Sequence, residues 1–440
     1  MPAITKKETR LKLKFVANTD HSIHAGLVAV EAMARRFGLW EKVRARKCLD
    51  PRRDKKRGYS PEVIIGQLIY AFCSGGGCLS DSEALNDDPL ARELFGVGKF
   101  ADQSQVGEWL REQGEESVAA LRQLLRELAL WVWQQAAPGR LLHAGQVEVF
   151  FDDTQLEVNG KHFEGAAINY NGDLALSWQT LWVGPLLCDS HVGKPGDVSD
   201  QLLPMLERDA ELWKGKKAHF YADSGSSAGA HLDAIAAQGW HYTVSYNKWT
   251  GPLERKAGEL PPGAWKQHGE EHHAFFRHQP EGRKEPQLYA VARRRDGLFD
   301  RYGFIACDEG QQDAGRVFER HHLKGDKERM FSEVLSGLDL HRPPCSALRA
   351  NQIYYLLGAL AYNLMVAIKL LDLQDDCQGW QLKTLMKKLV FMPGRLGRHA
   401  RQWVAKVLVP GAWLSWWQRW AQRVWPEHGV GRPSLSTATR

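Results

Sequence analysis

The sequence predicts an α/β fold, in which a mixed β-sheet is flanked by helices, preceded by an all-helical region and interrupted by a β-rich insertion. Short apolar strands alternate with amphipathic helices between residues 147 and 246, and the helical pattern then disappears until about residue 312. Capped helical patterns run from residue 60 to 135. At 440 residues, with 43% hydrophobic and 25% charged residues, the chain is long enough for two or three domains.

The first 59 residues form a basic N-terminal region. They hold 16 Lys and Arg against 6 Asp and Glu, with one apolar helical segment from residue 24 to 39. The run RARKCLDPRRDKKRGY that follows surrounds a proline, which favours a loop. Its basic side chains are interpreted either as phosphate contacts or as part of a solvated linker. The candidate contacts are Arg52, Arg53, Lys55 and Lys56.

Residues 60 to 140 are expected to form a helical domain. Ser60, followed by a proline and a glutamate, has the pattern of a helix N-terminus, and the glycines at residues 75 to 77 end that helix. Capping boxes are expected at Ser80 with Glu83 and at Asp102 with Gln105, and each would open another short helix. A longer amphipathic helix is expected over residues 115 to 135, where it would join this domain to the next or form a dimer surface.

Three short helices separated by tight turns are typical of a helix-turn-helix module, although any small helical domain shows the same pattern. The third helix would expose polar side chains at its N-terminus, where they are able to bond to bases or phosphates. These side chains are Gln103, Ser104 and Gln105.

Acidic residues follow two of the predicted strands. The apolar run VEVFF leads into Asp152, Asp153 and Thr154, and the strand HFYA leads into Asp223. Farther along, Glu328 lies beside an apolar stripe at helical spacing. Taken singly, an aspartate at a strand end is more often an ordinary cap or turn residue. Together, two such aspartates and a helix-borne glutamate supply the oxygen ligands that a site for two divalent cations needs.

In this order, the three acidic motifs resemble those of the DDE transposases of bacterial insertion sequences, specifically the cut-and-paste group with an RNase H-like core and a β-rich insertion before the glutamate. The matching positions are Asp152 in a D-x-T motif, Asp223 in a strand-D-S-G motif and Glu328 in a Tyr-x2-Arg-x3-Glu-x6-Lys motif. In the last motif His321 replaces the tyrosine, Lys324 replaces the arginine and a leucine replaces the final lysine. The run PPCSALRANQIYYLLGALAYNLM also resembles the family, so the resemblance spans roughly residues 60 to 370.

The resemblance implies an RNase H-like mixed sheet with an N-terminal all-helical DNA-binding domain and an inserted β-rich subdomain. The core would occupy residues 141–247 and 312–375, the insertion residues 248–311, and a basic, Trp-rich region residues 376–440. The implied function is a transposase that cuts the ends of its own element and joins the 3′-hydroxyl ends to target DNA. Asp152, Asp223 and Glu328 would be the catalytic residues and would bind two Mg²⁺ ions, for which Mn²⁺ would substitute.

The implied partners are double-stranded DNA, as terminal repeats and as target, and a second copy of the chain in the synaptic complex. His321 and Lys324 would hold a DNA phosphate, although a lysine cannot reproduce the bidentate contact of an arginine. In relatives that form hairpin DNA, an aromatic residue of the insertion receives a flipped base. Trp249 and Trp265 are the candidates here, with core packing as the more common use of such residues.

Three alternatives remain open from the sequence. Asp153 replaces Asp152 as the ligand if the strand register is shifted by one residue, although the D-x-T match favours Asp152. An RNase H-like nuclease that cuts without joining would share the same acidic residues. A DNA-binding descendant of a transposase would bind DNA ends without cutting them, and the intact acidic residues argue against it.

Charge is distributed unevenly along the chain. The net charge is +6, yet residues 1–59 and 378–440 are each near +10, whereas residues 60–377 hold 31 Lys and Arg against 45 Asp and Glu. Basic ends around an acidic centre suit a polyanion that is held at the ends and processed by carboxylates, with solvated tails as the alternative interpretation of either end.

The sequence also indicates a compartment. Seven scattered cysteines give no disulfide framework, which favours a reducing cytoplasm. The resemblance to transposases of bacterial insertion sequences implies that this cytoplasm is bacterial and that the protein is associated with the nucleoid. The opening MPAITKKETRLKLKF has no long apolar core after it, so neither a signal peptide nor an anchor is expected. Polar residues interrupt the apolar segment 351–371, which is therefore expected to be a buried core helix and not a membrane span.

Overall fold

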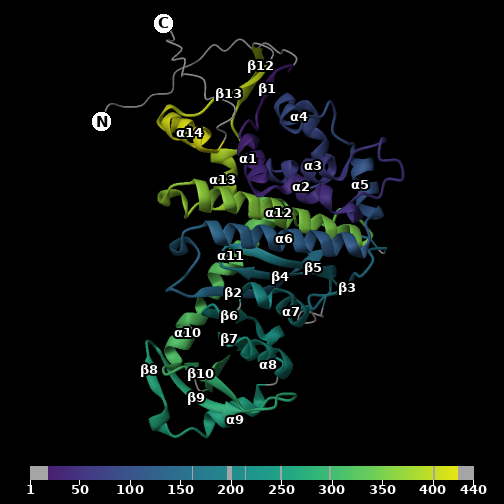
Figure 1. Cartoon of the computed structure of the whole chain (residues 1–440). Helices are drawn as coiled ribbons and strands as arrows, with labels where there is room; N and C mark the ends of the chain where they lie inside the picture. Colours follow the sequence, from purple (N-terminus) through teal and green to yellow (C-terminus); the bar gives the residue numbers. More distant parts are fainter. Residues whose placement is uncertain are drawn as a thin grey trace, which may run out of the picture.

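The structure is a computed structural model, which describes residues 18–160, 162–195, 201–213, 215–247, 250–296, 299–399 and 402–424. The molecule is elongated, and two long helices, α6 and α12, lie between the N-terminal helices and the central sheet (Figure 1).

One large mixed sheet forms the core. Its strands follow the order β3-β4-β2-β6-β7-β11-β10-β9-β8, and β5 pairs with β4. The pairs β2–β6 and β6–β7 are parallel and the others are antiparallel. The predicted mixed sheet flanked by helices is therefore confirmed. The strands are β2 (Val147–Glu157), β3 (Ala167–Ile168), β4 (Leu174–Val183), β5 (Leu186–Gly193), β6 (Ala218–Ala222), β7 (His241–Tyr246), β8 (Lys266–His268), β9 (Glu271–His278), β10 (Gln287–Asp296) and β11 (Phe299–Cys307).

The strands of the β-rich insertion extend this sheet. β11 pairs with β7, and β10, β9 and β8 follow outward, so the insertion and the core share one continuous sheet. The insertion also contains α9 (Gly251–Gly258), an eight-residue helix that is too short to show a clear helical period in the sequence. After the sheet, α10 (Ala314–His322) and α11 (Lys324–Gly337) return the chain to the core.

Helices precede the sheet in the described part of the chain. They are α1 (Leu27–Phe37), α2 (Leu39–Ala45), α3 (Pro61–Cys73), α4 (Pro89–Phe95), α5 (Gln103–Glu112) and α6 (Glu115–Gln135), with short 3-10 turns at Lys47–Leu49 and Pro138–Arg140. The expected capping box of Asp102 and Gln105 begins α5. At the other expected capping box no side-chain cap forms, and residues Ser80–Asp87 form a 3-10 helix. Glu83 instead accepts a hydrogen bond from the backbone N–H of Gln103 at the start of α5.

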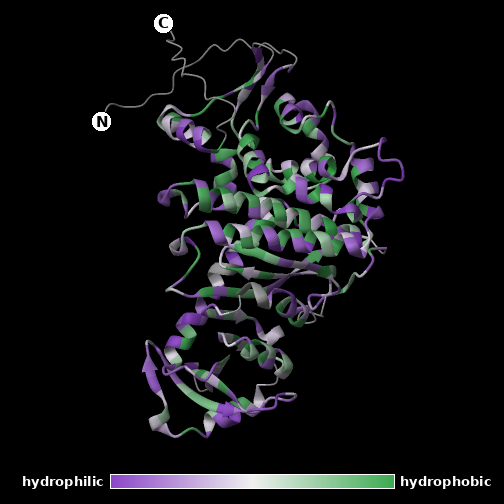
Figure 2. Ribbon diagram, viewed as in Figure 1, coloured by the Kyte–Doolittle hydropathy of each residue, from purple (hydrophilic) through white to green (hydrophobic). Residues whose placement is uncertain are grey.

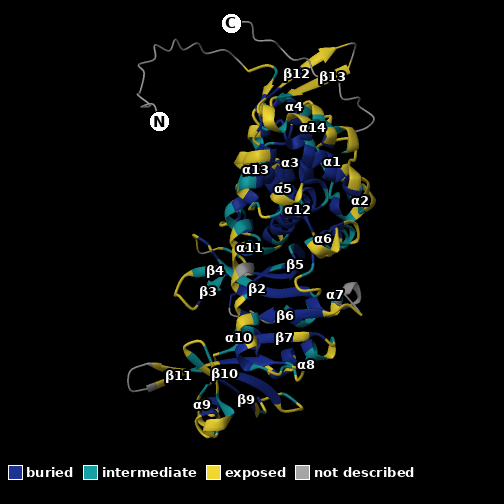
Figure 3. Ribbon diagram, turned by 90° about the vertical axis from the view of Figure 1, so that its left-hand side faces the viewer, coloured by how far each residue is buried: buried dark blue, intermediate teal, exposed yellow. Residues whose placement is uncertain are grey.

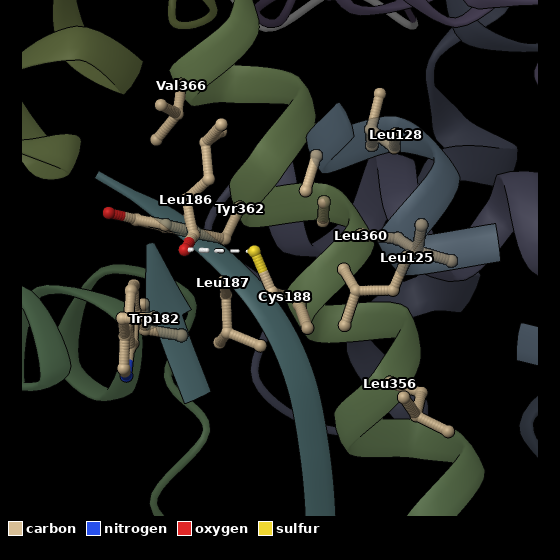
Figure 4. Close-up of a cluster of buried hydrophobic side chains, with 14 of the residues drawn as sticks. Leu125, Leu128, Trp182, Leu186, Leu187, Cys188, Leu356, Leu360, Tyr362 and Val366 are labelled. Carbon is tan, nitrogen blue, oxygen red and sulfur yellow. Dashed lines mark hydrogen bonds between the residues drawn. The ribbon is translucent and has the colours of Figure 1, made fainter. Parts of the chain in front are cut away.

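α12 (Leu348–Asp372) is the central helix of the core. By length and composition it could cross a membrane, but 94% of its apolar window is buried inside the protein. Figure 2 shows α12 as a largely hydrophobic helix and α6 as a helix with both hydrophobic and hydrophilic residues; the two run side by side between the two halves of the molecule. Side chains from α6, α12 and β5 pack together here (Figure 4); they include Leu125, Leu128, Leu186, Leu187, Leu356, Leu360 and Val366.

The polar residues of α12 bind backbone groups. Asn363 donates from Nδ2 to the carbonyl of Leu187 (2.7 Å), and its Oδ1 accepts from the N–H of the same residue (3.1 Å). Gln352 donates to the carbonyl of Val192 (2.9 Å). These bonds satisfy polar groups inside an apolar helix, which explains why the apolar segment tolerates them.

The remaining elements complete the two ends of the fold. α7 (Leu202–Trp213) and α8 (Gly229–Ala237) flank the sheet, and short 3-10 turns occur at Ser224–Ser226, Pro262–Ala264 and Asp375–Cys377. A second, three-stranded sheet joins β1 (His21–Ser22) to β12 (Gly394–His399) and β13 (Gln402–Val407), next to α13 (Leu382–Leu389) and α14 (Gly411–Val424). All seven cysteines are free thiols.

Candidate active site

Asp152 and Asp223 directly follow the last paired residues of two neighbouring parallel strands. The ladder between β2 and β6 ends at Phe151 with Ala222, so the next residue on each strand is an aspartate. Because the two strands are parallel, both aspartates lie at the same end of the ladder between β2 and β6. The sequence placed Asp152 at the end of its strand, but β2 continues to Glu157 because β4 goes on pairing with it after β6 stops.

Glu328 is supplied by α11, which packs on β4. The ring of Phe331 lies 5.1 Å from that of Trp178 and 6.1 Å from that of Trp182, and Val334 is buried beside it. Glu328 precedes Phe331 by three residues, so the two lie next to each other on the helix surface. The packing of Phe331 therefore fixes the position of Glu328 relative to the sheet.

The three carboxylates converge on one ammonium group. Lys324 Nζ lies 3.0 Å from Asp223 Oδ1, 3.0 Å from Glu328 Oε1 and 3.8 Å from Asp152 Oδ2. The side chain of Lys324 is only 7% exposed, whereas those of Asp223 and Glu328 are 57% and 61% exposed. Acidic residues from a strand, a strand end and a helix thus surround a single buried cation.

Burial dominates the electrostatics of this cluster. It raises the pKa of Asp152 to about 7, and the nearby Asp223 raises it as well, while the Lys324 ammonium acts in the opposite direction. Burial lowers the pKa of Lys324, but Asp152 and Asp223 outweigh it, so the net shift is upward. Lys324 is therefore protonated at neutral pH, and the ionised form of Asp152 depends on a cation beside it.

The donor set fits divalent metal ions. Carboxylate oxygens are the ligands that Mg²⁺ and Mn²⁺ prefer, and three of them already surround one positive charge. As the side chains stand, no three His, Cys, Asp or Glu residues in the described ranges are close enough together to hold a metal ion. The ammonium of Lys324 lies between the carboxylates, so a metal ion would take the place of this charge.

Asp153 faces a different set of groups. Its Oδ2 accepts hydrogen bonds from Ser177 Oγ (3.1 Å) and Gln155 Nε2 (3.0 Å). Successive side chains of a strand point to opposite faces, so only one of the two aspartates approaches Lys324 closely. In this structure that residue is Asp152.

His321 lies beside the cluster as a neutral ring. Its Nε2 is 2.7 Å from Ser245 Oγ, and burial, with Lys324 nearby, lowers its pKa to about 4. The ring therefore offers no positive charge to a phosphate at neutral pH. Arg320, the preceding residue, donates from Nε to the hydroxyl of Tyr221 (2.6 Å). Arg320 also donates to Gln146 (3.0 Å), just before β2 and so at the opposite end of that strand from Asp152. No local pattern in the sequence indicates the contact between Ser245 and His321, because it depends on the packing of distant segments.

The other expected DNA contacts lie apart from this cluster. Gln103, Ser104 and Gln105 are exposed at the start of α5, on the far side of α6 and α12 from β2 (Figure 1), although Gln105 also closes the capping box. The guanidinium of Arg293 lies over the ring of Trp265, 4.2 Å from the ring centre. Trp249 lies outside the described residues.

The basic loop after α2 is partly held by its own aspartate. Arg52 binds Asp50 through Nε (2.8 Å) and Nη2 (3.0 Å), and Lys55 donates to the Asp50 carbonyl (2.8 Å). Arg53 and Lys56 are exposed. Arg52 and Lys55 therefore contact Asp50 of the same loop, although Lys55 is also more than half exposed, whereas no such contact is seen for Arg53 or Lys56 in the described residues.

Two comparisons relate most of the chain to known transposases. A family model described as transposase DDE domain group 1 matches residues 5–408. Among solved structures, the chain is similar to a piggyBac transposase synaptic complex with hairpin DNA, with a TM-score of 0.48, 10% sequence identity, and coverage of 83% of this chain and 79% of that chain. No curated protein matches the chain significantly. Because the family model spans most of the 440 residues, the chain belongs to the transposase DDE domain family, group 1.

Proposed function

We propose that the protein is a DNA transposase of a bacterial insertion sequence, which cuts the ends of its own element and joins the 3′-hydroxyl ends to target DNA. The observation that carries the proposal is the convergence of Asp152, Asp223 and Glu328 on the buried ammonium of Lys324. Membership of the DDE transposase family supports it, since these enzymes generally use divalent metal ions.

Asp152, Asp223 and Glu328 would hold two Mg²⁺ ions, with Mn²⁺ as a substitute. When bound, such ions lower the pKa of the attacking water and stabilise the leaving oxygen. Once metal ions occupy the carboxylates, the displaced ammonium of Lys324 would be free to contact the scissile phosphate. The neutral His321 would support this arrangement by holding the end of α10 to β7 through Ser245.

The chemistry proceeds in two balanced steps. In the first, a water oxygen bonds to phosphorus and the bond from phosphorus to the 3′-oxygen breaks, which leaves a 3′-hydroxyl and a 5′-phosphate. In the second, that 3′-oxygen bonds to a phosphorus atom of the target and the target's own 3′-oxygen leaves. One phosphodiester bond replaces another in the second step, so no energy-rich cofactor is needed.

The proposed partner is double-stranded DNA. The exposed residues at the start of α5 and the exposed side chains of the basic loop, Arg53 and Lys56, would contact the terminal repeats. Synapsis of two ends calls for a homodimer, and we place the protein in the bacterial cytoplasm, where its DNA substrate lies.

Cleavage of a defined duplex tests the proposal. The purified protein is incubated with Mg²⁺ or Mn²⁺ and a duplex carrying the DNA that flanks its own gene, beside the Glu328→Gln variant. We expect metal-dependent nicks with 3′-hydroxyl ends at a fixed position, absent in the variant. The matched control is Glu319→Gln, which removes an exposed carboxylate of α10 that contacts His268 and not the cluster.

Other results of this cleavage assay would indicate a different function. Nicking without transfer of the 3′-hydroxyl end to a second duplex would indicate a nuclease. Specific binding without cutting would indicate a DNA-binding descendant of a transposase. Equal cutting by wild type and Glu328→Gln would show that Glu328 is not the third acidic ligand.

A further inference from the structure

The strands β12 and β13 form a ribbon that projects from the end of the molecule. Figures 1 and 3 place this ribbon beyond α13 and α14, at the end opposite to the insertion. Only its base is packed: Leu396 is 8% exposed and contacts a small cluster with Ala25 and Leu90. The described side chains of β13 from Gln402 to Lys406 are all exposed, although they alternate between the two faces of the ribbon.

Basic side chains lie on both faces of this ribbon. Arg395 and Lys406 are directly opposite each other and so share one face, while Arg398 lies opposite Trp403 on the other. Arg398 places its guanidinium 5.7 Å from the Trp403 ring centre, and this tryptophan is 51% exposed. Like charges on opposed residues destabilise a strand pair, and a polyanion would relieve this repulsion.

The surroundings of the ribbon add to its charge. No Asp or Glu occurs between Asp376 and Glu427 in the sequence. The helix α13, which precedes β12, exposes Lys383, Lys387 and Lys388. Among the described residues, Asp20 contacts Arg395 Nε at 2.5 Å. Neither the ribbon nor α13 contains a carboxylate that could neutralise Arg398 or Lys406.

We propose that the β12–β13 ribbon, together with the lysines of α13, is a second contact surface for duplex DNA, separate from the carboxylate cluster. The major groove of B-form DNA admits a two-stranded ribbon, and basic groups on both faces would then lie near the phosphates on either side of the groove. The exposed Trp403 with its stacked arginine provides a flat surface against the sugar-phosphate backbone. This inference rests on the proposed function, because duplex DNA is the substrate there.

The salt dependence of DNA binding tests the surface. Binding of the full chain to a labelled duplex is measured by fluorescence anisotropy at several salt concentrations, for wild type and for the double variant Arg398→Gln/Lys406→Gln. The plot of the logarithm of the association constant against the logarithm of the salt concentration has a negative slope. Each lost phosphate contact makes this slope less steep by about 0.9, so the double variant should be less steep than wild type by about 1.8. The charge-conserving variant Arg398→Lys/Lys406→Arg should restore the slope.

A matched control separates local from general charge effects. Lys216 and Lys217 are exposed just before β6, at the opposite end of that strand from Asp223, and Lys216→Gln/Lys217→Gln removes the same charge. If the ribbon variant keeps the wild-type slope, or changes only the oligomeric mass, the inference is overturned while the proposed function stands. If wild type binds no duplex, both are overturned.

Discussion

Replacing Lys324 with glutamine tests whether its ammonium acts as the counter-charge of the carboxylate cluster. In wild type this cation lies within 3.0–3.8 Å of all three carboxylates. Without it, the buried Asp152 loses its nearest positive charge. The metal-free variant should therefore be less stable than wild type, and it should bind divalent cations more tightly, because no resident cation has to be displaced.

The distances set the size of the effect. At 3.8 Å, opposite charges attract by about 4 kcal/mol at an effective dielectric constant of about 20. The cost of burying the lysine offsets much of this attraction, and the contacts to Asp223 and Glu328, both more than half exposed, add roughly 0.2–1 kcal/mol each. Asp152 also recovers part of the loss by binding a proton, since its pKa is already about 7. A decrease of about 1–3 kcal/mol in the free energy of unfolding is expected at slightly alkaline pH.

Two measurements without DNA cleavage provide the test. Thermal unfolding in the presence of a chelator should give a lower midpoint for Lys324→Gln, and added Mg²⁺ should restore more stability to the variant than to wild type. Titration calorimetry with Mn²⁺ should show about ten- to hundredfold tighter binding, since 1.4 kcal/mol corresponds to a factor of ten. The control is Lys42→Gln, which removes a lysine 3.0 Å from Glu127 in the helical region.

The reasoning would be refuted by a variant with wild-type stability and unchanged Mn²⁺ affinity. Weaker Mn²⁺ binding by the variant would also refute it, because it would mean that Lys324 supports the metal ions and does not compete with them. Absence of Mn²⁺ binding in wild type would refute the assignment of the carboxylates as ligands.

Three further predictions follow from buried or partly buried polar groups. Asp189→Ala should lower the free energy of unfolding by about 3–5 kcal/mol, measured by urea denaturation, because it removes a buried carboxylate that lies 2.9 Å from Arg122 and 2.7 Å from Arg208. Asp153→Asn should retain metal-dependent nicking while Asp152→Asn loses it, since only Asp152 contacts Lys324; the reverse result in the cleavage assay would exchange their roles. Burial, with a neighbouring arginine, lowers the pKa of His219 to about 3, so its contribution to stability is present above about pH 6.5 and is lost as the pH falls toward 3. The thermal midpoints of wild type and His219→Gln should be measured at about pH 7.5 and 5.5. Lowering the pH should decrease the midpoint of wild type more than that of the variant. An equal decrease in both proteins would contradict a neutral, buried His219.

Much of the fold follows from local patterns in the sequence. The capping box at Asp102 marks the start of α5, and the apolar period of residues 115 to 135 matches α6. The two aspartates were recognisable because each follows a short apolar strand, and parallel pairing of these strands brings them together. Lys324 lies four residues before Glu328, a spacing that places both on one side of a helix.

The rest depends on contacts between distant segments. The length of β2 beyond Asp152 is set by its partner β4, which no local pattern reveals. The approach of Ser245 to His321 requires that β7 and α10 pack together. The insertion joins the core sheet through the pairing of β11 with β7, and strand patterns alone do not distinguish an extended sheet from a separate subdomain.

The polar residues of α12 also bind backbone groups at one edge of the large sheet. On one side of β4 lies β2 and on the other β5, which has no further strand beside it in the described part of the chain. Such an edge offers free N–H and C=O groups to other molecules. Here Asn363 binds both backbone groups of Leu187, and Gln352 binds the carbonyl of Val192, so helix side chains take the place of another strand. The opposite edge, β8, is only three residues long. Both edges of the wide sheet therefore offer few free backbone groups to the strands of a neighbouring molecule.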